Sequence, residues 1–122
     1  MKLTSNERGE TLKTITLAAL AVVAALLAAA PASAATPTFK GTVGPGFTIT
    51  MASKPKTAGK IKLVIADKSP DHNFHLTGPG VNVKTSIGAV GSKTFLVTLK
   101  KGTYKFVCDP HATSMKGSFT VK

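Results

Sequence analysis

A short stretch near the C-terminus, residues 106–117, gathers three side chains that could bind a metal. It holds Cys108, the only cysteine of the chain, followed by His111 three residues later and Met115 four residues after that. Soft sulfur ligands of this kind select copper, zinc or iron–sulfur centres, and one thiolate with two imidazoles and a weak axial methionine is the donor set of a blue-copper electron-transfer site. Three of those four donors are present here, so the stretch predicts a soft-metal site that needs a second histidine from elsewhere.

The two remaining histidines lie together in residues 72–77, a β-compatible segment that we predict to be a strand. Side chains alternate between the faces of a strand, so His72 and His75 are expected to point in opposite directions and only one can join the site. We favour His72, because it stands at the strand terminus, where loops meet. Asn73 can then hydrogen-bond across to the loop that carries Cys108, as outer groups do at metal sites. His75 is expected to be a strand histidine with a local hydrogen bond.

The chain begins with the pattern of a secretory signal peptide, which we assign to residues 1–34. A positively charged start precedes an uncharged apolar run over residues 15–30, and small residues follow at 31–34. The apolar run is short for a membrane span, which takes about 20 residues. We therefore expect an exported protein that begins at Ala35 and is periplasmic, extracellular or on the outer face of the cell membrane. An uncleaved N-terminal anchor is the competing interpretation, and membrane association is expected only in that case.

Residues 35–122 are long enough for one small domain, and no segment in them has helical periodicity. About seven short segments have strand character, separated by turns rich in glycine, proline and aspartate. This spacing favours an all-β fold, a Greek-key antiparallel β-sandwich, with the signal segment as a preceding helix. Residues 81–91 are predicted to be a loop or an edge strand. The other strands are predicted over residues 38–43, 47–51, 60–67, 72–77, 92–99, 103–108 and 117–121.

The predicted domain is strongly basic, with 13 lysines, no arginine and three aspartates, and hence a net charge of +10. Nucleic-acid binders more often cluster arginine and aromatic residues on one element, so we expect no nucleic-acid partner. Lysine alone suits loose, transient contacts with acidic proteins or an anionic membrane face. A single cysteine allows no internal disulfide, and we expect a monomer.

The two motifs together resemble the small cupredoxins, the families of plastocyanin, pseudoazurin and amicyanin. His72-Asn73 matches their His-Asn pair, and the run from Cys108 to His111, including the proline before the histidine, matches their Cys-x-x-His…Met loop. The resemblance covers nearly all of residues 35–122. It implies one type 1 copper ion bound by His72, Cys108, His111 and Met115, with Asn73 supporting the loop. The three residues between His111 and Met115 exceed the amicyanin spacing and fall short of the plastocyanin spacing.

The function implied by the resemblance is that of a mobile one-electron carrier in the cell envelope, working with redox partner proteins and not as an enzyme. A copper-binding or copper-delivery protein could use the same residues, and it remains the main alternative. Two further classes are an oxidase domain that works with additional copper centres and a metal-free adhesion module. The carboxylates of Asp71 and Asp109 could indicate zinc, but we interpret them as turn residues, which aspartate favours.

Overall fold

The computed structural model describes residues 28–122, of which Ala34–Lys122 form a compact unit. Most of the predicted signal peptide, including its expected helix, lies in residues 1–27, outside the described part. Residues 28–37 have no regular secondary structure. None of the described residues forms a helix that could cross a bilayer.

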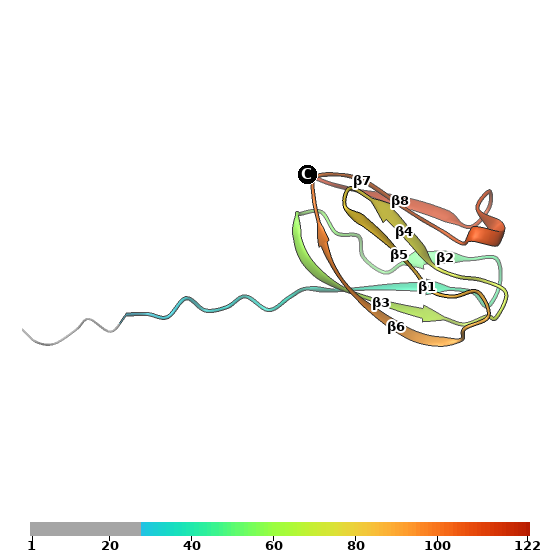
Figure 1. The fold of residues 1–122 in the computed structure, drawn as a ribbon, viewed down its shortest axis with the longest axis horizontal. Coiled ribbons are helices and arrows are strands. Elements are labelled where there is room, and N and C mark those ends of the chain that lie inside the picture. The colour runs from blue at the N-terminus through green and yellow to red at the C-terminus, as the bar shows by residue number, and fades with distance from the viewer. Residues whose placement is uncertain (1–27) are drawn as a thin grey trace, which may run out of the picture. The chain divides into compact units, whose positions relative to one another are not determined.

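Within residues 28–122, eight strands form two four-stranded sheets that pack face to face (Figure 1). The first sheet has the order β2-β1-β3-β6, and the second has the order β5-β4-β7-β8. The prediction of an all-β sandwich is therefore confirmed, and the 81–91 region contains the predicted edge strand. The strands are β1 (Thr38–Val43), β2 (Ile49–Met51), β3 (Gly59–Asp67), β4 (His75–Gly78), β5 (Val81–Lys84), β6 (Gly91–Leu99), β7 (Gly102–Val107) and β8 (Lys116–Val121), with one 3₁₀ helix, η1 (Asp109–His111), between β7 and β8.

One strand pair is parallel, a detail that the sequence did not indicate. β1 runs beside β3 in register from Thr38 opposite Lys62 to Val43 opposite Asp67, whereas all other pairs in the described chain are antiparallel. Parallel neighbours need a crossover connection, and here β2 and the following loop provide it. As a consequence β1 and β3 end at the same edge of the sheet. The loops that follow them, residues 44–48 and 68–74, therefore meet at one pole of the sandwich.

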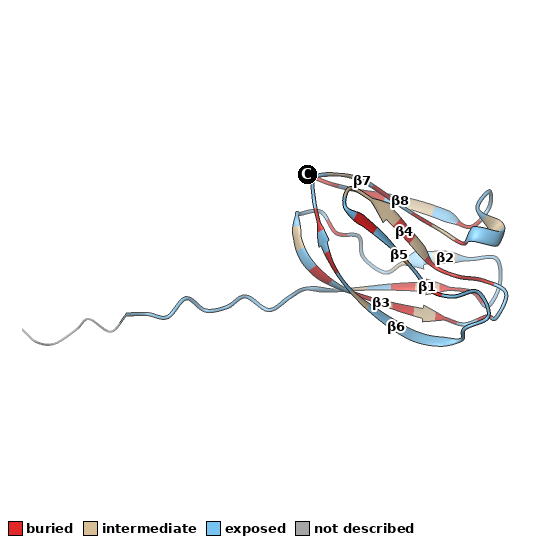
Figure 2. Ribbon diagram, in the orientation of Figure 1, coloured by how far each residue is buried: buried red, intermediate tan, exposed pale blue. Residues whose placement is uncertain are grey.

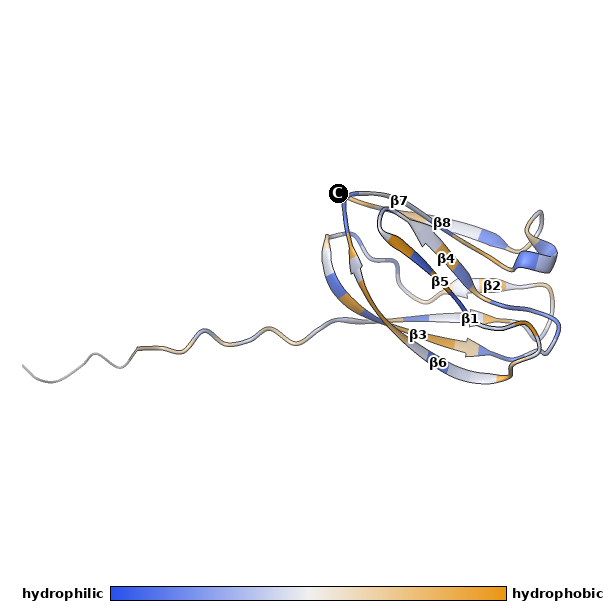
Figure 3. Cartoon of the chain, in the orientation of Figure 1, coloured by the Kyte–Doolittle hydropathy of each residue, from blue (hydrophilic) through white to orange (hydrophobic). Residues whose placement is uncertain are grey.

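The core lies between the sheets and is built from alternate residues of the strands, as period-two burial requires (Figure 2). Hydrophobic and hydrophilic residues are correspondingly interleaved along the strands (Figure 3). Two stacked aromatic pairs anchor the second sheet: Phe74 with Phe106, and Tyr104 with Phe119, at ring-centroid distances of 5.5 and 5.2 Å. The hydroxyl of buried Tyr104 donates to the carbonyl of Pro79 over 2.9 Å. The core thus holds β4 and β7 in fixed register. These neighbouring strands lead to the two loops of the candidate site.

Gly78 lets the Tyr104 ring pass directly over β4, because a Cβ at this position would overlap that ring. We expect Gly78→Ala to destabilise the protein by about 1–3 kcal/mol, the usual cost of overpacking. Gly46→Ala is the matched control, since nothing lies within 4 Å of the corresponding Cβ position. Urea unfolding of both variants checks the expectation, and equal midpoints for the two would contradict it.

The strand predicted over residues 72–77 begins only at His75, which corrects the earlier boundary. Residues 72–74 belong to the loop before β4, and the backbone donors of Asn73 and Phe74 are directed to groups outside the sheet ladder. The N–H of Asn73 points to Cys108 Sγ at 3.5 Å, and the N–H of Phe74 donates to Thr85 Oγ1 over 2.9 Å. The argument that His72 and His75 occupy opposite faces of one strand was therefore wrong, although the two side chains do lie apart.

Candidate metal centre

The pole where the loops meet brings three of the predicted ligand residues together. His72 Nδ1 and His111 Nδ1 are 3.2 Å apart, and Cys108 Sγ lies 3.7 Å from the first and 3.6 Å from the second. Cys108 is fully buried and His72 is 3 % exposed, while His111 is partly exposed. His72 thus forms a compact triangle with Cys108 and His111, which lie 36 and 39 residues later in the sequence. The triangle is buried at His72 and Cys108 and accessible to solvent at His111.

The size of this triangle fits one metal ion. A point in its plane lies about 2 Å from all three donor atoms, close to the roughly 2.0–2.3 Å of metal–nitrogen and metal–sulfur bonds at protein sites. One thiolate and two imidazoles in a trigonal arrangement, with a weak axial sulfur, are the blue-copper donor set. The residues present therefore fit a copper ion without rearrangement of the chain.

The loop between β7 and β8 holds Cys108, His111 and Met115 through its own backbone. The N–H of His111 donates to the carbonyl of Cys108 over 3.0 Å, which forms the turn of η1, and Pro110 suits the start of such a helix. The N–H of Met115 donates to the carbonyl of His111 over 2.8 Å, and its carbonyl accepts the N–H of Cys108 over 3.0 Å. The backbone of Met115, a residue that is 1 % exposed, is thereby hydrogen-bonded to that of Cys108.

The loop that carries His72 is shaped by two side chains that bind its backbone. Asp67 Oδ1 accepts the N–H of Ser69 over 3.1 Å, and Ser69 Oγ accepts the N–H of Asp71 over 3.2 Å. Burial raises the pKa of Asp67, and the hydrogen bond from the Ser69 N–H and the electrostatic influence of His72 offset only part of that rise. Burying the Asp67 carboxylate is therefore unfavourable by itself, but the same side chain forms the turn that positions His72.

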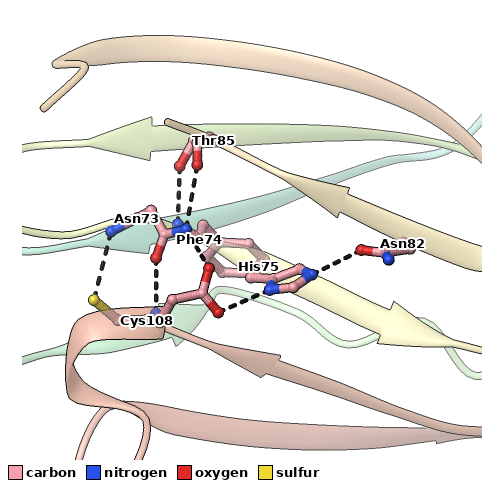
Figure 4. A network of polar contacts seen from close by, with 7 residues as sticks. Asn73, Phe74, His75, Asn82, Thr85 and Cys108 are labelled. Atoms are coloured by element: carbon pink, nitrogen blue, oxygen red, sulfur yellow. Dashed lines mark hydrogen bonds and ion pairs between the residues drawn. The ribbon is translucent and has the colours of Figure 1, made fainter. Parts of the chain in front are cut away.

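Asn73 joins the two halves of the site, as expected from the sequence (Figure 4). Its Oδ1 accepts the N–H of Asp109 over 2.8 Å, and its Nδ2 donates to Asp109 Oδ2 over 2.8 Å and to the carbonyl of Thr85 over 3.2 Å. Its own N–H points to Cys108 Sγ. The buried side-chain amide of Asn73 thus ties the β7–β8 loop to the loop after β5, while its backbone N–H is directed at the sulfur.

Asp109 has a larger role than the turn residue that the sequence suggested. Besides Asn73, it binds His75, whose Nδ1 lies 2.8 Å from Asp109 Oδ1 while His75 Nε2 lies 2.7 Å from Asn82 Oδ1. Figure 4 shows the contact between the ring of His75 and the side chain of Asn82. His75 therefore has a structural hydrogen-bonding role, but its partners are not local in sequence: they come from the ligand loop and from β5.

The pKa of Asp109 lies below its ordinary value. Burial acts to raise it, but hydrogen bonds from Asn73 and His75 and the positive charges of His75 and Lys84 together outweigh burial. A depressed carboxyl pKa stabilises the folded state at pH values above the unfolded pKa, and that stability is lost as the pH falls through the folded-state pKa.

We therefore expect the copper-free wild type to lose thermal stability more steeply than Asp109→Asn below about pH 4, the ordinary carboxyl range. Above that range the wild type should be the more stable of the two. Asp71→Asn, which removes an exposed carboxylate from the neighbouring loop, serves as the charge-matched control. Parallel melting-temperature curves for the wild type and Asp109→Asn between pH 7 and pH 2 would count against this account.

Phe47 covers the outer side of the two histidines, a contact that no sequence pattern predicted. Its ring meets those of His72 and His111 edge-on, at centroid distances of 5.5 and 4.9 Å, although the side chain is 68 % exposed. The sequence placed Phe47 in a strand, but β2 begins at Ile49. The turn after β1 positions it: the N–H of Gly44 donates to the carbonyl of Thr48 over 2.9 Å, and a Cβ on Gly44 would come within 3.0 Å of Ser69 Cβ.

Comparison with known proteins finds structures of similar fold. Among solved structures, a reduced rusticyanin aligns with 25% identity and a TM-score of 0.56, covering 74% of this chain and 81% of that one. Rusticyanin from Thiobacillus ferrooxidans aligns with 23% identity and a TM-score of 0.51, covering 74% and 79%. Auracyanin from Roseiflexus castenholzii aligns with 23% identity and a TM-score of 0.53, covering 73% of this chain and 99% of that one.

No curated protein sequence matches the chain. The family model of the cupredoxin-like domain, however, matches residues 16–121, which include both loops of the candidate site and every strand. The two packed sheets, the donor triangle at one pole and this match over most of the sequence show that the chain belongs to the cupredoxin-like family.

Proposed function

We propose that this protein is a type 1 copper protein that carries single electrons. The observation that supports this most directly is the triangle of Cys108 Sγ and the Nδ1 atoms of His72 and His111, already at the spacing a single ion requires. We assign these three residues and Met115 as the ligands. A bound copper ion would supply the one-electron change between Cu(II) and Cu(I). Rusticyanin, one of the similar structures, is a copper protein that has been observed in its reduced form.

The protein's contribution is a rigid frame around the donors. Cys108 and Met115 are joined through their backbones, and Asn73 links the loop of His72 to that of Cys108. Because both loops are fixed to the sandwich, the donors have little freedom to rearrange when the charge at the site changes. A small rearrangement favours fast electron exchange. With all four ligands in place, the ion would also have no open coordination position of the kind that catalytic metal sites keep.

We further propose that residues 1–34 are a signal peptide, residues 35–122 are the mature domain, and the protein works as a mobile carrier in the cell envelope. The single cysteine supports this, since a thiol held by a metal is protected in an oxidising compartment. The excess of exposed lysines suits redox partners with acidic docking surfaces.

The test is to titrate the purified protein with copper and record its visible spectrum and its voltammogram. An intense visible band that saturates at one equivalent, together with a reversible one-electron wave, is the expected result. A delivery protein would instead release the ion to a Cu(I) chelator during reduction. Copper binding without the visible band would refute the type 1 assignment.

A further inference from the structure

The outer face of the second sheet carries charge of only one sign over its strands. Its outward side chains on β5, β4, β7 and β8 include Lys84, Lys105 and Lys116, all exposed. The charged groups are separated by small or uncharged residues such as Thr77 and Ser118. His75 also faces outward, but Asp109 at the adjoining pole pairs with it. The face is therefore open and cationic, without a carboxylate on any of its four strands.

Strand register places these lysines in a defined array. Lys84, His75, Val107 and Lys116 are successive cross-strand neighbours in one row, and Lys105 stands in the next row beside Thr77. Neighbouring strands are about 4.8 Å apart, so Lys84 and Lys116 are about 14 Å apart at the backbone. At an ionic strength of about 0.01 M the three charges act together, because the screening length of about 30 Å exceeds their separation.

The same row lies next to the candidate metal centre. Val107, in the middle of the row, is the residue before Cys108 and is only partly buried, so it is the outward side chain nearest along the chain to the thiol. The loops of the pole itself offer no net positive charge, because Lys68 is outnumbered there by Asp71 and Asp109. An acidic surface is thus attracted more strongly to the flank formed by the second sheet than to the pole.

We propose that this lysine face of the second sheet is the docking surface for a redox protein with an acidic patch, and that electrons pass there through the Val107–Cys108 segment. The inference rests on the proposed function and adds the location of the partner. Charge complementarity of this kind accelerates encounter in a salt-dependent way while leaving the intrinsic site unchanged.

The test uses the copper-loaded protein at gold electrodes coated with a carboxylate-terminated alkanethiol monolayer, with a hydroxyl-terminated monolayer as the neutral reference. The test variant replaces Lys84, Lys105 and Lys116 by glutamine. The matched control replaces Lys40, Lys60 and Lys62, three exposed lysines of β1 and β3 on the first sheet, and therefore changes the net charge equally. Each variant's potential and visible spectrum are recorded, so that a change in driving force or a loss of folding is recognised.

At an ionic strength of about 0.01 M we expect the test variant to exchange electrons with the carboxylate surface at least about tenfold more slowly than the wild type, and the control less than about twofold more slowly. On the hydroxyl surface the three proteins should agree, and the single variants Lys105→Gln and Lys116→Gln should give intermediate rates.

Equal slowing by both triple variants, or slowing by neither, would overturn the proposal. It would also fail if the test variant lost binding to phosphatidylserine vesicles while keeping its rate at the carboxylate surface, since a lipid surface would then be the occupant. A wild type without a reversible wave on either monolayer would instead refute the proposed electron-carrier function, so the two failures are distinguishable.

Discussion

The copper-loaded Cys108→Ser variant is expected to lose the intense visible absorption of the wild-type protein completely. That absorption arises from charge transfer between a thiolate and Cu(II), and a serine hydroxyl, which stays protonated at neutral pH, cannot supply it. Sγ also stands at one corner of the donor triangle, 3.6 and 3.7 Å from the two imidazole nitrogens. Copper affinity should therefore fall as well. Spectra recorded during titration with Cu(II) measure both effects.

Two histidine variants serve as controls for this result. His72→Ala should also abolish the band, because it removes a corner of the triangle. His75→Ala should leave the band nearly unchanged, because its ring nitrogens contact Asp109 and Asn82 and not the donor atoms. A coloured Cys108→Ser variant would contradict the copper–thiolate assignment. Loss of colour in His75→Ala but not in His72→Ala would show that the wrong histidine has been assigned.

Phe74→Ala is expected to produce the largest loss of stability among single substitutions near the site. The ring is 1 % exposed, stacks on Phe106 and lies against Gly41, where an added Cβ would come within 2.9 Å of it. Truncating such a phenylalanine costs about 3–5 kcal/mol, because the lost burial is compounded by a cavity that the two sheets cannot close. Urea unfolding of the copper-free protein measures this cost without the contribution of metal binding.

Phe47→Ala is the matched control, since it removes the same side chain from a position that is 68 % exposed. Its cost should stay within about 0.5–1 kcal/mol, as for most surface substitutions. If the two variants unfolded at similar urea concentrations, Phe74 would not be the core residue that the packing indicates.

Much of the architecture follows from local sequence pattern. The strand-forming residues of 60–67 and 92–99 predicted the two long strands β3 and β6, and the structure extends each by one residue. This works because apolar and β-compatible side chains that can fill a sandwich core are visible in the sequence directly. The start of the strand predicted over 72–77 was wrong, because Asn73 and Phe74 have β-compatible side chains but their backbone N–H groups are directed to Cys108 and Thr85.

The donor types at the candidate centre were likewise predictable from sequence, because cysteine, histidine and methionine are the side chains that offer soft or borderline donors. Asn73 was expected to bridge the two loops, and it does. The role of Asp109 was not predictable, because its link to His75 joins positions 34 residues apart whose proximity depends on the register of β4 beside β7.

The sequence by itself determined the donor types, the strand periodicity and the strongly basic charge. Only the tertiary structure decided that β1 runs parallel to β3, and this pairing brings the loops of Phe47 and His72 to one pole. Register across the second sheet likewise places Lys84 and Lys116 in one row with Val107. The physical reason is that donor type and periodicity are properties of residues and their near neighbours, whereas the meeting of distant loops depends on how whole strands pair.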